Sequence, residues 1–155
     1  MPSRLGKQHC ALRLKGDCLV KASCHGSPHV DLDLVSKASR FRYHDPLDSW
    51  AGARALRSSI SRAGVLSPVW VREAGEGGAL ELVHGHRRVE AARELGLREI
   101  PALVMNEEPA ELFIQAVETH AHHGEQNLRE AAAAMEVALA LGLDQQQVAR
   151  RLMPA

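Results

Sequence analysis

Aromatic residues are scarce in this chain of 155 residues: two Phe, two Trp and one Tyr make up 3% of it. The core must therefore consist mainly of aliphatic side chains. No apolar run approaches the roughly 18 residues of a membrane-spanning helix, which excludes an integral membrane protein. All three cysteines precede residue 25, so no even-numbered disulfide framework is expected. No continuous apolar segment follows Arg4 and Lys7, which argues against a secretory signal. We expect a cytoplasmic protein.

A net charge is also absent, because 19 Lys and Arg balance 19 Asp and Glu. The charges are nevertheless unevenly distributed. Residues 1–44 hold eight basic and three acidic residues, whereas 107–155 hold three basic and eight acidic ones. A basic front end can contact a polyanion, but no dense Lys/Arg block is present. The pattern favours a basic tail on a neutral domain.

Residues 1–29 show neither a period of 2 nor one of 3.6, and we interpret them as a tail or loose extension. Cys10, Cys18, Cys24 and the nearby histidines raise the alternative of a zinc cluster. Their spacing is wider than the tight C-x2-4-C knuckle of zinc sites. The sequence therefore favours a tail without a metal.

Residues 30–106 predict a small layer of strands and helices. Alternating apolar residues, β-branched runs and three- or four-residue periods identify the segments, and glycines mark their ends. The expected elements are a strand at 30–35, a helix capped by Ser49 and stopped by Gly64, a hairpin of 65–72 and 79–83, a helix ending at Leu95, and a strand at 100–105.

Residues 107–155 predict helices only. Pro109 suits the first turn of one helix, a second runs from about 128 to 141, and Gly142 ends it. Asp144 can cap a last helix. That helix resembles the first helix of a helix-turn-helix, so we expect a helical segment ending in a truncated helix-turn-helix.

Chemistry is concentrated where a predicted strand meets a helix, at His84-Gly85-His86-Arg87-Arg88. Glycine allows a tight turn or the close approach of a ligand. The first N–H groups of a helix have no partner and attract anions, above all phosphate. Two arginines in the first turn oppose the helix dipole unless something negative binds them. The alternative is a pair of solvated arginines on an amphipathic helix. From these residues alone, anion binding and solvated arginines are equally supported.

The segment 85–104, GHRRVEAARELGLREIPALV, resembles the signature box of ParB-type partition proteins, which reads GERRxRA followed by LxxIPxxV. Upstream, 56–72 reads LRSSISRAGVLSPVWVR and is similar to the family pattern LxxSIxxxGxxxPxxVR. Downstream, 118–131 reads ETHAHHGEQNLREA and aligns without gaps with the family's ENxQR segment and its following helix. The resemblance covers about residues 30–152.

This resemblance implies an α+β fold in which a ParB/sulfiredoxin-like layer at 30–106 is followed by helices at 107–155. It implies a module of DNA partition or regulation that binds CTP with Mg2+. It also implies a nucleotide-dependent homodimer and, through DNA, association with the nucleoid. Without a recognition helix, any DNA contact of this chain is expected to be non-specific.

The family pattern carries phosphate binding over to Gly85, His86, Arg87, Arg88 and His122, and metal binding to Glu118 and Thr119. His86 stands where the family has Glu, and Thr119 replaces Asn. Ala121 replaces Gln and His122 replaces Arg. Because alanine cannot position water, we expect little turnover, at most that of a weak CTPase. The loop at 40–42 is the candidate for a further phosphate contact.

Three alternatives remain at this point. Sulfiredoxin chemistry needs a cysteine where Gly85 stands, so it is close to excluded. A small phosphotransferase on the same fold, with a DGHHR box for transfer to serine, is loosely similar to 83–87 and lacks its Asp. Five histidines also suggest a metal site: His84, His86, His120, His122 and His123. The favoured interpretation is that they are polar side chains around an anion site.

Overall fold

The computed structural model describes residues 10–13, 19–22, 28–75, 78–121 and 128–152. They form one mixed sheet with helices on both faces. In chain order the elements are β1 (Cys10–Arg13), β2 (Leu19–Ala22), β3 (His29–Asp31), the 3-10 turns Leu32–Leu34 and Leu47–Ser49, α1 (Ala53–Ala63), β4 (Val69–Glu73), β5 (Leu80–His84), α2 (His86–Glu94), β6 (Glu99–Val104), α3 (Pro109–Ala121), α4 (Leu128–Ala140) and α5 (Gln145–Leu152).

The strand order is β1-β2-β3-β6-β4-β5. Strands β4 and β6 are parallel, and the other neighbouring strands are antiparallel. The predicted hairpin is confirmed, because Val71 pairs with Leu82 and Arg72 with Glu81. A return through α2 brings β6 beside β4, since parallel strands need a crossover connection. This arrangement places the start of α2 at the end of β5.

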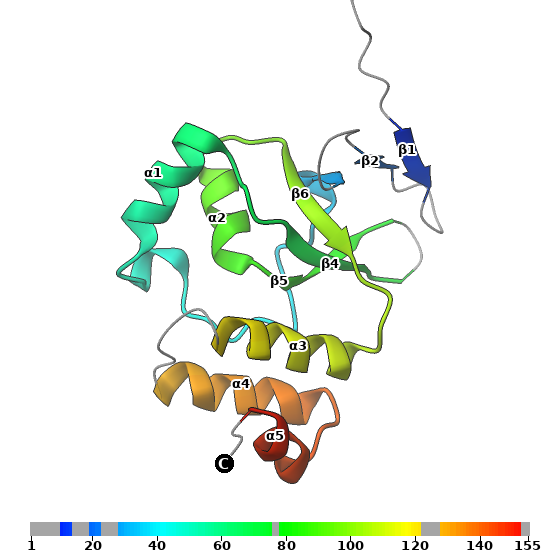
Figure 1. The fold of residues 1–155 in the computed structure, drawn as a ribbon, viewed down its shortest axis with the longest axis vertical. Helices are drawn as coiled ribbons and strands as arrows, with labels where there is room; N and C mark the ends of the chain where they lie inside the picture. The colour runs from blue at the N-terminus through cyan, green and yellow to red at the C-terminus, as the bar shows by residue number, and fades with distance from the viewer. Residues whose placement is uncertain (1–9, 14–18, 23–27, 76–77, 122–127, 153–155) are drawn as a thin grey trace, which may run out of the picture.

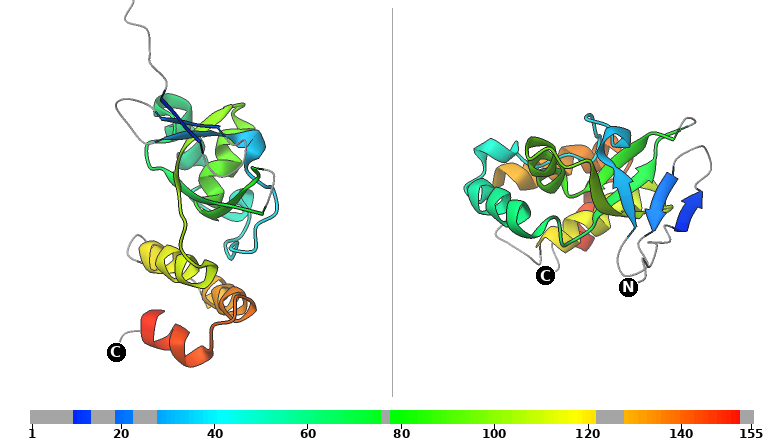
Figure 2. Two further views of the ribbon diagram at one scale, coloured as in Figure 1. Left: turned by 90° about the vertical axis from the view of Figure 1, so that its right-hand side faces the viewer. Right: turned by 90° about the horizontal axis from the view of Figure 1, so that it is seen from above.

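The two faces of the hairpin pack against different helices (Figure 1). Leu80 and Leu82 face a core that includes Val89 and Ala92 of α2. Val83 faces the opposite way, into a core shared with Phe113 of α3 and residues of α4 and α5. This separation follows from the alternation of side chains along a strand. Figure 2 shows α3, α4 and α5 together on one side of the sheet.

Several sequence predictions are confirmed in detail. Gly64 ends α1 with φ 72°, and its N–H bonds to the carbonyl of Ile60 at 2.8 Å. Asp144 caps α5, since its carboxylate accepts from the N–H of Gln147 at 2.7 Å. The Gln147 side chain accepts in turn from the N–H of Asp144 at 3.0 Å, which completes a reciprocal cap.

Other expectations differ from the structure. The strand expected at 30–35 ends at Asp31, whose carboxylate accepts from the N–H of Asp33 and starts a 3-10 turn. Ser49 is not the cap of α1; it lies in the preceding 3-10 turn, and Gly52 holds the cap position. The segment expected as a tail contributes β1 and β2, four residues each, for which the sequence carries no periodic signal. Within the described residues, no helix is long and apolar enough to cross a membrane.

Candidate functional site

Gly85 sets the geometry of the candidate site, because it joins β5 to α2 with φ 103°. A Cβ at this position would lie 2.5 Å from Cγ1 of Val69, closer than side chains pack. Any other residue would be strained by both the backbone and this contact. As the N-cap residue of α2, Gly85 offers no side chain to the first turn. The first N–H groups of a helix attract anions where no side chain occupies them.

Arg87 lies in that first turn and bonds to a carboxylate of a distant helix. Its Nη2 donates to Oε1 of Glu130, on α4, at 2.7 Å. Its guanidinium also stacks on the ring of Trp50, 4.5 Å from the centroid. Within the described residues its buried Nε has no hydrogen-bond partner. Arg87 is thus held by two neighbours and still has unused donor capacity.

Trp50 owes its position to a small neighbour. A Cβ on Gly52 would lie 2.3 Å from the indole ring, so the ring rests directly on the backbone of that residue. Trp50 is 37% exposed. The indole therefore acts as a partly exposed platform for the guanidinium of Arg87.

His86 does not face the solvent as a phosphate ligand would. The residue is 5% exposed, and its Nε2 is buried without a hydrogen-bond partner among the described residues. Burial, aided by the positive charges of Arg42, His44 and His84, lowers the pKa of His86 to about 3. At neutral pH the imidazole is uncharged. Its side chain is therefore suited to packing at the start of α2.

Arg88 points toward the sheet. Its Nη1 donates to the carbonyls of Ser67 at 2.7 Å and Pro68 at 2.9 Å. Burial lowers the pKa of Arg88 from its ordinary value. These contacts tie the first turn of α2 to the segment that leads into β4. Of the two neighbouring arginines, Arg87 is the one beside the exposed indole.

The predicted metal ligands lie on α3. Oε1 of Glu118 pairs with Nε of Arg151, on α5, at 3.2 Å. The hydroxyl of Thr119 donates to the carbonyl of Gln115, one turn earlier, at 2.8 Å. His122 lies outside the described residues. Glu118 and Thr119 thus keep oxygen lone pairs, but each already makes a contact within the helical segment.

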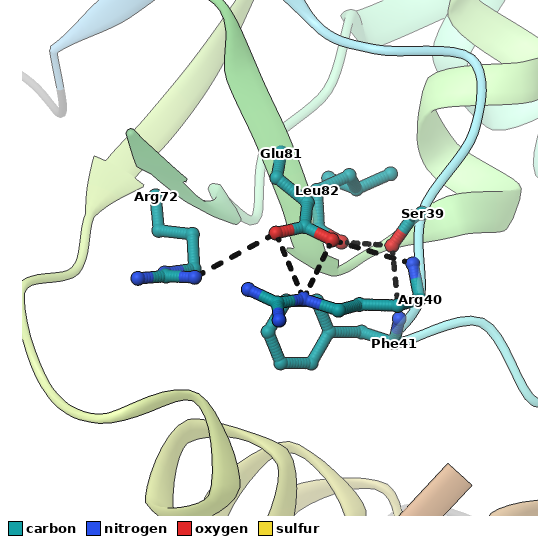
Figure 3. A network of polar contacts seen from close by, with 6 residues as sticks. All are labelled: Ser39, Arg40, Phe41, Arg72, Glu81 and Leu82. Atoms are coloured by element: carbon teal, nitrogen blue, oxygen red, sulfur yellow. Dashed lines mark hydrogen bonds and ion pairs between the residues drawn. The ribbon is translucent and has the colours of Figure 1, made fainter. Parts of the chain in front are cut away.

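The loop around Arg40 is pinned to the sheet by polar contacts (Figure 3). Nε of Arg40 lies 3.2 Å from Oε1 of Glu81, and Nη1 of Arg72 lies 3.7 Å from the other carboxylate oxygen. The hydroxyl of Ser39 donates to the carbonyl of Leu82 at 2.6 Å. Arg40 therefore pairs with the carboxylate of Glu81 on β5 in this structure.

Arg42 points toward α2, where it pairs with Glu90. The second carboxylate oxygen of Glu90 accepts from the N–H of Leu47 at 2.8 Å. The Nη2 of Arg42 is buried, with no hydrogen-bond partner in the described part of the chain. Arg42 therefore fixes the loop on α2.

Glu130 is the centre of a buried polar cluster that sequence reasoning missed. The residue is 5% exposed. Nδ1 of His44 lies 3.5 Å from Oε1 of Glu130, and Nε2 of His120 lies 3.9 Å from Oε2. Burial opposes ionisation of Glu130, but the hydrogen bond from Arg87 and the nearby positive charges outweigh it, so its pKa lies below the ordinary value.

The available sequence signals for this cluster were weak. Glu130 stands in an Ala-rich helix and reads as a solvated charge. Trp50 is one of only two tryptophans, which was the only hint of a special position. Both contact Arg87, which lies 43 residues from Glu130 and 37 residues from Trp50 along the chain. Helical periodicity carries no information at that separation.

Fold and site together define a class of protein: a small α+β domain in which an arginine in the first turn of a helix pairs with a buried carboxylate. The model of the ParB N-terminal domain family matches residues 29–120, more than half of the chain. The chain belongs to the ParB N-terminal domain family.

Curated relatives agree with this assignment. The chain is 36% identical over 99 residues to the chromosome-partitioning protein Spo0J of Thermus thermophilus, a match covering 64% of this chain and 36% of that protein. It is 43% identical over 61 residues to a probable plasmid-partitioning protein ParB of the same species, covering 39% and 20%. This chain therefore matches about a third or less of the length of these relatives.

A solved structure supports the fold. The C-terminally truncated chromosome-partitioning protein ParB of Caulobacter crescentus, complexed with CTP-γ-S, superposes with a TM-score of 0.52. The match covers 82% of this chain and 77% of that one, at 22% identity. The predicted α+β class and ParB-like arrangement are thus confirmed.

Proposed function

We propose that this chain is the nucleotide-binding module of a partition protein and that it binds CTP through its phosphates at the start of α2. The observation that carries the proposal is the position of Arg87 in the first turn after Gly85, stacked on the partly exposed indole of Trp50. Membership of the ParB N-terminal domain family supports it, as does the CTP analogue held by the Caulobacter protein.

The residues present fit a phosphate group. Gly85 gives the sharp left-handed turn into α2, and as the N-cap residue it places no side chain on the first amides of the helix. Arg87 adds a permanent positive charge with a buried Nε that has no hydrogen-bond partner among the described residues. Arg88 and His86 act as supports: Arg88 ties the turn to the sheet, and the neutral His86 packs beneath it.

Mg2+ is the cation that normally accompanies a nucleotide triphosphate, and it would neutralise part of the phosphate charge. Glu118 and Thr119 supply the kind of oxygen ligands that this cation prefers. To take part, the carboxylate of Glu118 would have to exchange Arg151 for the metal. We propose both residues as the metal side of the site, with His122 as a further phosphate contact.

The proposal extends to the organisation of the chain. Residues 30–106 form the nucleotide-binding core, and 107–155 form a helical segment whose Glu130 pairs with Arg87 in this structure. The role in DNA partition, the nucleotide-dependent homodimer and the action at the nucleoid follow from the family. DNA contact by this chain is expected to be non-specific and salt-sensitive, because phosphate contacts alone carry no sequence information.

Replacement of Arg87 tests the proposal. Arg87→Ala should weaken CTP binding about tenfold or more, because a charge-assisted bond to phosphate contributes about 1.5–3 kcal/mol. The measurement is calorimetric titration with CTP in the presence of Mg2+, with circular dichroism to check the fold.

Arg98→Ala is the matched control, since Arg98 is exposed beyond the opposite end of α2. It should bind CTP as the unaltered chain does. Equal losses of CTP affinity in both variants would mean that only the net charge of the chain matters. An unchanged CTP affinity in Arg87→Ala would overturn the assignment of this residue.

A further inference from the structure

The buried cluster around Glu130 has the composition of a transition-metal site. Its nitrogen and oxygen atoms come from three separate elements: His44 in the loop before α1, His120 on α3 and Glu130 on α4. One ligand atom from each of the three residues lies within 4.8 Å of the others. Among the described residues, this is the one group of three or more potential ligands with that proximity.

The distances are close to those of an occupied site. Zinc bonds of about 2.0–2.1 Å in a tetrahedron place neighbouring ligand atoms about 3.3 Å apart. Here the nitrogens of His44 and His120 lie 3.5 Å and 3.9 Å from the carboxylate oxygens of Glu130. The three ligand atoms lie within 4.8 Å of one another, so the side chains have to close by at most about 1.5 Å to bind one ion.

The imidazole of His44 is placed as a buried ligand would be. Its side chain is 7% exposed, and Nδ1 forms no hydrogen bond within the described part of the chain. A buried nitrogen without a hydrogen-bond partner is stabilised by a bound cation.

The surroundings provide a supporting shell. Arg87 holds one oxygen of Glu130, as hydrogen bonds from outer residues hold metal-bound carboxylates. Its positive charge opposes a nearby cation, but a carboxylate has about four lone-pair sites and can serve more than one partner. The ring of Tyr43 packs against both histidines, with centroids 3.9 Å from His44 and 6.2 Å from His120.

We propose that His44, His120 and Glu130 form a binding site for a divalent transition metal of the zinc class. Two imidazoles and one carboxylate are the ligand set of open, four-coordinate zinc centres. Imidazole also discriminates against Mg2+, so this site is distinct from the magnesium contacts proposed at Glu118. It joins the loop before α1 to α3 and α4, and it shares the Arg87–Glu130 contact with the proposed nucleotide site.

The first experiment uses Co2+ with the full chain, in which the three cysteines are replaced by serine so that thiols do not compete. Tyr43 is the one tyrosine of the sequence. Co2+ at the proposed site should shift and broaden its ring proton signals. Co2+ binding that leaves those signals unchanged, or no binding of Co2+ at all, would overturn the proposal.

The second experiment uses variants. His120→Asn should weaken Co2+ binding about tenfold or more and remove the visible absorption bands of four-coordinate cobalt. His29→Asn and His123→Asn are the controls and should keep both. Loss of the bands in either control with retention in His120→Asn would contradict the assignment, and Zn2+ displacing Co2+ one for one would support it.

Discussion

Gly85 carries two separate constraints, a positive φ and contact with Val69, and a matched glycine separates them. Gly96 has φ 72° but nothing within 4 Å of a would-be Cβ. Gly96→Ala should therefore cost about 1–2 kcal/mol of unfolding free energy, the penalty of the left-handed conformation. Gly85→Ala should cost about 1–3 kcal/mol more, because overpacking adds to it.

Urea unfolding of the two glycine variants checks this prediction. Equal losses of stability would show that the contact with Val69 relaxes without cost. Gly85→Ala should also lose CTP affinity even where it stays folded, because its Cβ and the altered turn change the backbone that faces the phosphates.

His86 makes the stability of the fold depend on pH. Its pKa is about 3 in the folded chain, against an ordinary value of 6.5. Below pH 6.5 the unfolded chain takes up a proton that the folded chain does not, so stability falls as the pH falls. Between pH 7 and pH 5 the unfolding free energy should drop by about 2 kcal/mol from this residue.

In His86→Gln that part of the pH dependence should disappear, whatever the variant does to stability at pH 7. Unfolding curves at both pH values measure the difference, and a chelator removes any contribution of bound metal. His29→Gln is the control and should keep the full dependence. A slope that is the same in His86→Gln and in the unaltered chain would contradict the neutral, buried state of this histidine.

At the scale of elements, α4 brings a carboxylate to the residue proposed to bind phosphate. A phosphate at Arg87 meets the negative charge of Glu130. Glu130→Gln keeps a hydrogen-bond acceptor but removes that charge. The affinity for CTP should rise severalfold, on the order of 1 kcal/mol for like charges a few Å apart.

Glu136→Gln alters an exposed acid of the same helix and should leave CTP affinity unchanged. Calorimetry on both variants decides the question. A tenfold loss of affinity in Glu130→Gln would mean that the carboxylate orients Arg87 for binding rather than competing with the nucleotide.

The elements also show how far the sequence could be interpreted. The hairpin, α2 and the helices from Pro109 onward could be predicted, because local periodicity and glycine stops specify them. The end of β3 could not, since it depends on the side chain of Asp31 turning back on its own backbone. Strands β1 and β2 were missed because sheet pairing, rather than local pattern, defines them.

The candidate site divides in the same way. The start of α2 could be located from Gly85 and the arginines that follow it. The different orientations of the two arginines could not, because Arg87 turns toward Glu130 and Arg88 toward the carbonyls before β4. Partners that the fold brings together from distant segments leave no trace in a single sequence.

At the scale of the whole molecule, the sheet layer and the helical segment share one apolar core. Phe41 and Val83 from the layer pack with Phe113 of α3 and Val148 of α5. Arg87, at the start of α2, belongs to the sheet layer, and Glu130 belongs to the helical segment. A nucleotide bound at Arg87 would therefore affect the position of the helices.

For turnover we predict little or no activity, since Ala121 offers no group to position water.

The most direct test of the central claim compares CTP with cytidine, which has the same base and sugar but no phosphates. Calorimetric titration of the full chain, with Mg2+ present, should show binding of CTP and at least tenfold weaker binding of cytidine, because the proposed contacts go to phosphate. No heat with CTP, or equal affinities for both compounds, would contradict a phosphate site at the start of α2.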